Sequence, residues 1–241
     1  MTTGTRPTNV SDRPSDVEPM TVVVHELRAS LTLLNGYLSM LDGAPEGTRN
    51  EYVAIMQSIV ADMDRTSEVL VLAARLDAGA MPLEPREFDA RDVVTNAMLL
   101  VGPRAGLEHA EIVMSAPREP ARAWADPFHT TRIVTNLLHN AISYSSRPAK
   151  VTVEIRPGDP VVIAVLDSGV GIPPEYQNVI FDPFRRLDGV TPGRGRGLGL
   201  GLHISRELAA LSGGSLVLEH SKSGEGSTFA LRLPAAHPAR P

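Results

Sequence analysis

The strongest local pattern in the chain is the segment Val161-Val162-Ile163-Ala164-Val165-Leu166-Asp167-Ser168-Gly169-Val170-Gly171-Ile172-Pro173. Its first six residues are all apolar and lie between turn-forming residues, which predicts a buried β-strand. At the end of that strand the Asp167 carboxylate either forms the turn or accepts a hydrogen bond from an exocyclic amine. Gly169 and Gly171 would let the backbone approach a flat base closely.

The sequence on either side of this segment predicts further strands and helices of a mixed α/β domain. Short β-forming runs predict strands over 111–114, 121–124, 150–155, 215–219 and 228–233. Helical spacing of apolar residues predicts helices over 90–101, 126–143 and 200–211. We therefore expect an α/β sandwich over residues 88–234, after a Pro-rich linker over 81–87 and before a tail over 235–241.

The N-terminal third of the chain predicts a helical hairpin behind a disordered leader, residues 1–18. The first helix has apolar residues in alternating steps of three and four, at Val24, Leu27, Leu31, Leu34, Leu38 and Leu41. Residues 42–47 interrupt the pattern, and a second helix with similar steps follows until Gly79 and Pro82 end it. A hairpin over 19–80 has little core of its own, so we expect a dimeric four-helix bundle, with packing on the rest of the same chain as the alternative. The predicted fold class is α+β.

Composition excludes several classes of protein. The chain has 241 residues, 42% of them hydrophobic, which is enough for a buried core. It has no cysteine, so disulfide scaffolds, cysteine nucleophiles and cysteine-ligated metals are excluded. The formal net charge of −5 does not favour a nucleic-acid partner. No apolar run approaches the roughly 18 residues that a membrane helix needs.

Three further groups of residues could carry chemistry. Asn136 and Asn140 share a helical face, where they either form polar surface or offer oxygens to Mg²⁺. The segment 193–202 alternates glycine with other residues ahead of a helix, which presents N–H groups to an anion unless it is only a flexible linker. His25 lies beside the heptad seam with Glu26 next to it; this carboxylate can orient the imidazole and accept its proton, although a lone surface histidine usually has no function.

In this order the segments resemble the cytoplasmic core of bacterial sensor histidine kinases, over roughly residues 20–234. The matching segments are His25-Glu26-Leu27-Arg28 for the phosphoacceptor box, Asn136-Leu137-Leu138-His139-Asn140-Ala141 for the asparagine box, Asp167-Ser168-Gly169-Val170-Gly171-Ile172-Pro173 for the first glycine box, Phe181-Asp182-Pro183-Phe184-Arg185-Arg186 for the phenylalanine box and Gly197-Leu198-Gly199-Leu200-Gly201-Leu202 for the second glycine box.

The resemblance implies a HisKA-type hairpin joined to a GHKL-type ATPase domain, which together act as an autokinase that uses ATP and Mg²⁺. By this similarity His25 would attack the γ-phosphate with Glu26 as its base, and Asn140 would ligate Mg²⁺. Asp167 would bind the adenine amino group. The other implied ATP-binding residues are Asn136, Tyr144, Gly169, Gly171, Ile172, Arg186, Gly197, Leu198, Gly199, Gly201 and Leu202.

The resemblance also implies partners: a second copy of the chain, and the aspartate of a response regulator that receives the phosphate in the cytoplasm. Two alternatives stay open, a non-enzymatic ATP-binding dimeric scaffold and a GHKL serine kinase of the anti-sigma type. The sequence shows no sensor domain, so we expect either a minimal kinase or a fragment of a longer one.

Two departures from the family pattern carry expectations. Ala29-Ser30 stand where Thr-Pro is usual, and the residue four positions after the histidine is thought to orient the water for regulator dephosphorylation. Ala29 has no polar side chain, so we expect weak phosphatase activity. Ser143 stands where Lys or Arg is common, which removes one expected phosphate contact.

Overall fold

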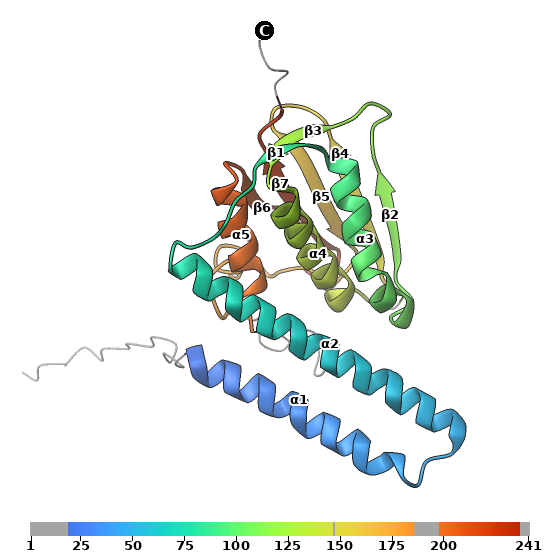
Figure 1. Cartoon of the computed structure of the whole chain (residues 1–241). Helices are drawn as coiled ribbons and strands as arrows, with labels where there is room; N and C mark the ends of the chain where they lie inside the picture. Colours follow the sequence, from blue (N-terminus) through green and yellow to red (C-terminus); the bar gives the residue numbers. More distant parts are fainter. Residues whose placement is uncertain (1–18, 147, 186–197, 237–241) are drawn as a thin grey trace, which may run out of the picture.

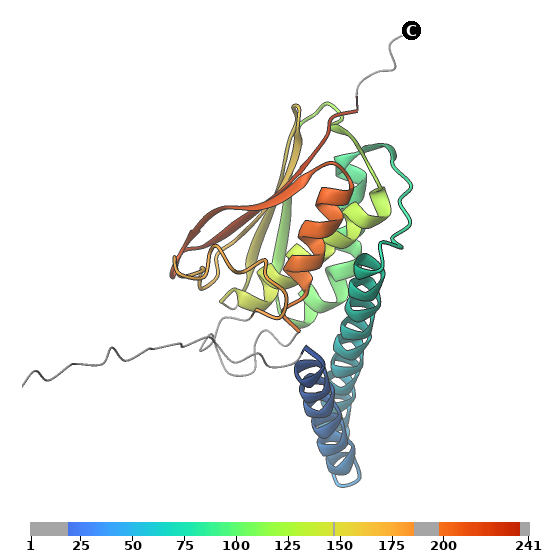
Figure 2. The same ribbon diagram turned by 90° about the vertical axis from the view of Figure 1, so that its left-hand side faces the viewer.

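A computed structural model describes residues 19–146, 148–185 and 198–236. Within these ranges a helical hairpin precedes a two-layer unit in which helices cover one face of a β-sheet (Figures 1 and 2). The predicted α+β class is therefore confirmed. None of the helices in the described ranges combines the length and the hydropathy that crossing a membrane requires.

The hairpin consists of α1 (Pro19–Leu41) and α2 (Glu46–Asp77), with the rings of Tyr37 and Tyr52 in contact between them at 5.5 Å. The predicted apolar seam of α1 is divided between two environments. Every second member of it is partly buried: Leu27, Leu34 and Leu41. The members between them are 46%, 48% and 49% exposed: Val24, Leu31 and Leu38.

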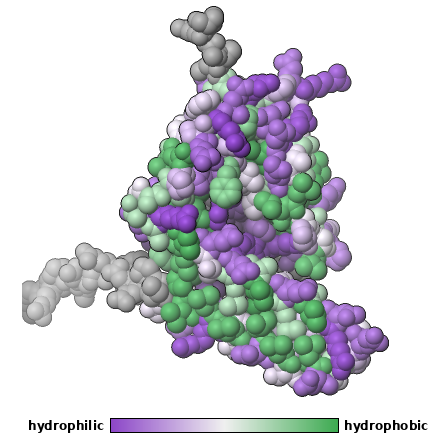
Figure 3. Space-filling view, viewed as in Figure 1, coloured by the Kyte–Doolittle hydropathy of each residue, from purple (hydrophilic) through white to green (hydrophobic). Residues whose placement is uncertain are grey.

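The exposed members of the seam belong to a larger apolar surface on the hairpin. Val53, Val60 and Val71 of α2 are also 40% exposed or more. Figure 3 shows hydrophobic side chains gathered over α1 and α2, in contrast to the more polar surface above them. A single hairpin thus leaves uncovered every second residue of the predicted α1 seam, together with apolar residues of α2 outside its predicted seam.

The main sheet has five strands in the order β2-β4-β5-β7-β6. Their bounds are β2 Glu111–Ser115, β4 Lys150–Arg156, β5 Val161–Asp167, β6 Ser215–Lys222 and β7 Gly226–Leu233. β2 pairs with β4 in parallel and the other pairs are antiparallel.

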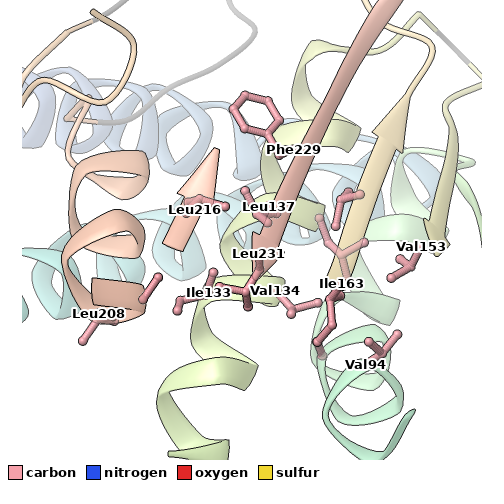
Figure 4. Packing of buried hydrophobic residues seen from close by; sticks show 14 of the residues in the cluster. Val94, Ile133, Val134, Leu137, Val153, Ile163, Leu208, Leu216, Phe229 and Leu231 are labelled. Atoms are coloured by element: carbon pink, nitrogen blue, oxygen red, sulfur yellow. The ribbon is translucent and has the colours of Figure 1, made fainter. Parts of the chain in front are cut away.

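Three helices cover one face of this sheet: α3 (Ala90–Leu107), α4 (Pro127–Tyr144) and α5 (Gly201–Leu211) (Figure 2). Figure 4 shows the core between the two layers, where α4 is central and contributes Ile133, Val134 and Leu137 against Ile163 and Leu231 of the sheet. The apolar face of α4 is thus fully used in packing, which leaves its opposite face to carry polar groups.

Asp126 fixes both the start of α4 and the connection from the hairpin. One carboxylate oxygen accepts the N–H groups of Phe128 (2.8 Å) and His129 (3.1 Å), which caps the helix. The other accepts the N–H of Glu84 at 2.8 Å. His129 is buried at 4% exposure and donates from Nε2 to the Pro82 carbonyl oxygen at 2.9 Å. Residues 82–84 are therefore held against α4.

Two elements differ from the sequence-based expectation. The structure has a strand β1 (Arg86–Asp89) that overlaps the end of the Pro-rich segment and pairs antiparallel with β3 (Arg122–Ala125). α3 runs to Leu107 instead of ending at Val101, although Pro103 lies inside it. Because Val101 and Ala105 are buried in the core, tertiary packing offsets the hydrogen bond that Pro103 cannot donate.

Candidate functional site

A pocket opens where β5 ends, between the last turn of α4 and the segment that follows β5. Its wall combines apolar side chains with a few polar ones, which is typical of small-molecule sites. The lining residues are Asn140, Tyr144, Asp167, Val170, Gly171, Ile172, Tyr176, Val179, Ile180, Arg185, Leu202, Ser227 and Phe229.

Asp167 is the acidic group of this pocket. Its Oδ1 accepts the Gly169 N–H at 2.8 Å, and the Ser227 N–H also hydrogen-bonds to its carboxylate. Burial raises the pKa of Asp167 above its usual value, and the two N–H donors oppose that shift. The carboxylate is thus held in place by the backbone, with its acceptor capacity directed to a pocket that excludes much of the water.

The turn after β5 is fixed on both sides. Ser221 Oγ accepts the Ile172 N–H at 2.8 Å, and Gln177 Nε2 donates to the Ile172 carbonyl oxygen at 2.9 Å. Gly171 has a φ of +67°, and a Cβ there would collide with the backbone of Lys222. Gly171 therefore permits a close approach to another backbone segment of the protein, and its predicted approach to a flat base stays a prediction.

The two asparagines of α4 share a face but meet different neighbours. Asn140 lines the pocket, together with Tyr144 one turn later. Asn136 instead donates from Nδ2 to Ser205 Oγ of α5 at 2.9 Å. A Cβ on Gly201 would lie 2.5 Å from Asn136 Oδ1, so the start of α5 packs directly on this amide. Asn136 thus joins α4 to α5.

The start of α5 closes the pocket on the side opposite β5. Leu198 is buried and Leu202 lines the pocket. Gly199 has a φ of +69° and packs so closely on the backbone of Phe184 and Arg185 that a side chain would not fit. Of the other predicted phosphate-binding residues, Arg186 and Gly197 lie outside the described residues.

A larger cavity of about 560 Å³ continues from this pocket toward the hairpin. The two share Asn140, Tyr144, Ile180, Arg185 and Leu202. α2 forms one wall of the larger cavity, and α3, α4 and α5 form the others. The whole depression thus extends from an acidic, largely apolar end at Asp167 to a polar end beside α2.

The structure does not bring His25 into this depression. His25 is exposed on α1 and Glu26 beside it is partly buried. No residue of α1 lines either cavity. The predicted nucleophile and the predicted nucleotide-binding residues are thus separate in this arrangement.

The described residues contain no group of three or more His, Cys, Asp or Glu side chains that could hold a metal ion. The predicted metal ligand Asn140 lies at the junction of the two cavities. An amide oxygen there suits Mg²⁺, which takes oxygen ligands and completes its shell with water and phosphate oxygens.

Sequence reasoning missed Ser227 and Ser221, which lie in the β6–β7 hairpin. Strand register places Ser227 opposite Asp167, and Ser221 Oγ lies 2.9 Å from Ser227 Oγ. No local pattern indicates this pairing because it depends on which strands are neighbours in the sheet.

Comparisons with known proteins agree with this geometry. Residues 125–237 match the family model described as histidine kinase-, DNA gyrase B-, and HSP90-like ATPase. Histidine protein kinase DivJ of Caulobacter vibrioides is 32% identical over 216 residues, which are 87% of this chain and 36% of DivJ. The chain spans about a third of the length of the curated relatives it matches.

Solved structures extend the likeness across the hairpin. Full-length ShkA in complex with AMPPNP has a TM-score of 0.65 and 25% identity, and the match covers 92% of this chain and 47% of that one. Histidine kinase ThkA in complex with response regulator protein TrrA has a TM-score of 0.64 at 21% identity, covering 91% of this chain and 62% of ThkA, which shows the shared fold. Residues 125–237 are therefore similar to the histidine kinase-, DNA gyrase B- and HSP90-like ATPases, and the likeness to histidine kinases extends over most of the chain.

Proposed function

We propose that the chain is an ATP-dependent protein-histidine autokinase of a two-component system, which phosphorylates His25 and passes the phosphate to an aspartate of a response regulator. The observation that carries this proposal is the continuous depression from Asp167 to α2, in an ATPase domain joined to a hairpin that bears His25-Glu26. The similarity to DivJ supports it, because the match includes both the hairpin and the ATPase domain.

In the proposed complex the adenine base occupies the pocket at the end of β5. The Asp167 carboxylate accepts a hydrogen bond from the exocyclic amine, while Gly169, Gly171 and Ile172 form the wall against the base. The phosphates extend toward the start of α5, where the backbone around Gly199 and Gly201 and the positive end of the helix dipole attract them. Arg186 and Gly197 would complete this end.

Asn140 would hold Mg²⁺ through its side-chain oxygen, and the ion would neutralise charge on the phosphates. The position of Asn140 between the base pocket and the larger cavity supports this assignment. Asn136, which binds Ser205, would act by fixing the start of α5 beside the phosphates.

The transfer step is an in-line displacement at the γ-phosphorus. A lone pair of the neutral His25 imidazole forms a P–N bond while the bond to the β,γ-bridging oxygen breaks, and ADP leaves with that electron pair. The imidazole proton passes to the Glu26 carboxylate. An aspartate of the regulator then attacks the phosphorus, and the P–N electrons return to the imidazole. With ATP and a receiver domain as reactants, the reaction takes place in the cytoplasm.

Because His25 lies outside the nucleotide depression, transfer requires either movement of the ATPase domain along the hairpin or the His25 of a second protomer. The exposed apolar surface of α1 and α2 supports a homodimer through a four-helix bundle. In the proposed dimer the hairpin over 19–80 forms the bundle, and the segment 81–87 connects it to the ATPase domain over 88–234.

The proposal is tested by incubation with γ-labelled ATP and Mg²⁺. We expect acid-labile, base-stable label on the wild type, and none on His25→Gln, which should still bind ATP because His25 does not line the pocket. Label that persists on His25→Gln would identify another acceptor, such as His129 or His139. A wild type that binds ATP and takes up no label would instead be the non-enzymatic scaffold.

We further propose that dephosphorylation of the regulator is weak. Ala29 lies one helical turn after His25 and is exposed, but it has no group that could orient a water. Ala29→Thr should therefore raise the rate of regulator dephosphorylation measured with ADP present. A fast wild-type rate that the threonine leaves unchanged would contradict this expectation.

A further inference from the structure

The cavity beside α2 has an excess of positive charge. Its basic lining residues are Arg65 of α2, Arg104 of α3, Arg132 of α4 and Arg185; its acidic ones are Asp62 and Glu68, both of α2. Glu68 pairs with Arg132 at 3.0 Å. Asp62 is therefore the acidic lining residue that contacts both Arg65 and Arg104, while Glu68 also attracts Arg65 from a greater distance.

Asp62 is shared between these two guanidinium groups. It forms an ion pair with Arg65 on its own helix, and Arg104 Nη1 approaches the same oxygen at 3.5 Å. Burial lowers the pKa of Arg65 to about 10, repulsion from Arg104 contributes, and attraction by Glu68 opposes the shift. Burial also lowers the pKa of Arg104, against the attraction of Glu108, which lies outside the cavity lining. One carboxylate thus faces two partly desolvated cations.

His139 does not change this balance of charge. Its Nδ1 lies 2.8 Å from Arg65 Nη1 and accepts that N–H. A guanidinium only donates, so the Nδ1 that accepts from it carries no proton and the imidazole adds no charge to the cavity in this arrangement. The polar end of the depression is therefore a site for an anion.

Arg185 lines both cavities, and Arg104 is a second cation that contacts the α4 residues beside their junction. Its Nη2 donates to Ser143 Oγ at 2.9 Å. Ser143 lies between Asn140 and Tyr144, the two α4 residues that line both cavities. The Arg104 guanidinium thus reaches Ser143, the α4 position at which Lys or Arg is common in the family that the sequence resembles.

We infer that Arg104, supported by Arg65, binds the phosphate groups of the nucleotide in the cavity between α2, α3 and α4. The inference rests on the proposed function, since it assumes a nucleotide whose base lies against Asp167. The inferred phosphate site thus includes Arg104 of α3 and, in this arrangement, Arg65 of the hairpin. The Asp62 carboxylate then competes with the phosphates for Arg104.

Because Asp62 and the phosphates compete for Arg104, substitutions of Asp62 and of Arg104 should change the affinity for ATP differently. Arg104→Gln and Asp62→Asn break the same ion pair between the hairpin and the ATPase domain. If Arg104 binds phosphate, Arg104→Gln should weaken ATP binding by about tenfold, because a hydrogen bond between charged groups is lost. Asp62→Asn should leave ATP binding equal or tighter. Calorimetry on the full chain at fixed Mg²⁺ measures both, and the affinity for adenosine, which has no phosphate, should be the same in all three proteins.

A second variant separates lost phosphate binding from a general disturbance of the fold. Arg104→Gln combined with Ser143→Lys returns a cation to the same place from α4 and should recover most of the ATP affinity. Arg122→Gln is the control: it removes a surface arginine that pairs with Glu87 and should leave the affinity for ATP unchanged. Equal ATP affinity of Arg104→Gln and wild type, or the same shift for Arg104→Gln and Asp62→Asn, would overturn the inference and leave a purely structural contact between domains. A wild type that binds no ATP would instead refute the proposed function.

Discussion

At the scale of single residues, the polar end of the depression makes the stability of the protein depend on pH. The unfolded chain protonates His139 near pH 6.5, whereas the folded protein does so only near pH 3. Since the unfolded state binds the extra proton between these values, the free energy of unfolding falls as the pH is lowered through this window. Between pH 7 and pH 5 we expect a loss of about 2 kcal/mol from this group.

Urea unfolding at pH 7 and pH 5 measures the effect, with His139→Gln as the matched variant. Glutamine can still accept a hydrogen bond from Arg65 but does not titrate. The difference in unfolding free energy between the two pH values should therefore be smaller in His139→Gln than in the wild type. Identical pH dependence of the two proteins would show that His139 is protonated equally in the folded and unfolded states.

At the scale of elements, the two helix caps of the ATPase domain should differ in their contributions. Asp89 accepts one N–H, that of Arg91, at the start of α3. Asp126 accepts two at the start of α4 and also the Glu84 N–H from the connection to the hairpin. Asp89→Ala should cost about 1 kcal/mol of unfolding free energy, and Asp126→Ala about 2 kcal/mol or more. Denaturant unfolding of both variants gives the comparison, and equal losses would mean that the additional contacts of Asp126 with the His129 and Glu84 N–H groups contribute nothing.

The elements also show how far the sequence predicts this fold. Long periodic or apolar runs predicted α1, α2, α4, α5 and the central strands within a few residues, because such patterns arise from burial on one face. β1 was missed because Arg86-Glu87-Phe88-Asp89 has one apolar residue and exists through its pairing with β3. The continuation of α3 past Pro103 was missed because packing overrode a local helix breaker.

The candidate site divides in the same way. Asp167, Gly171, Asn140 and Tyr144 could be predicted, because each lies in a local motif with a chemical meaning, and the structure brings them to one pocket. Ser227 and Arg104 could not, since a strand register and a contact between helices bring them there. His129 is a polar residue in the first turn of α4, yet it is buried, because the connection from the hairpin folds over it.

At the scale of the whole molecule, assembly can be tested on the two sets of seam residues. Leu31 is 48% exposed and Leu34 is partly buried in the hairpin. Leu31→Glu should shift the protein from dimer to a monomer of 25.8 kDa with unchanged helix content, because it places a charge only in the interface between copies. Leu34→Glu should instead reduce helix content, because it also disrupts the pairing of α1 with α2. Light scattering with circular dichroism distinguishes them, and a wild type that is monomeric at micromolar concentration would refute the dimer.

The division of the α1 seam has a consequence for how such proteins diverge after gene duplication. One set of leucines packs within the hairpin, and the alternating set is exposed. In the proposed dimer, different residue positions therefore determine the folding of the hairpin and the choice of the partner chain. Substitutions at Val24, Leu31 and Leu38 can make two sister chains mutually incompatible without unfolding either of them. If the proposed dimer forms through these positions, the specificity of pairing can evolve at a few surface residues while the residues of the proposed nucleotide site stay the same.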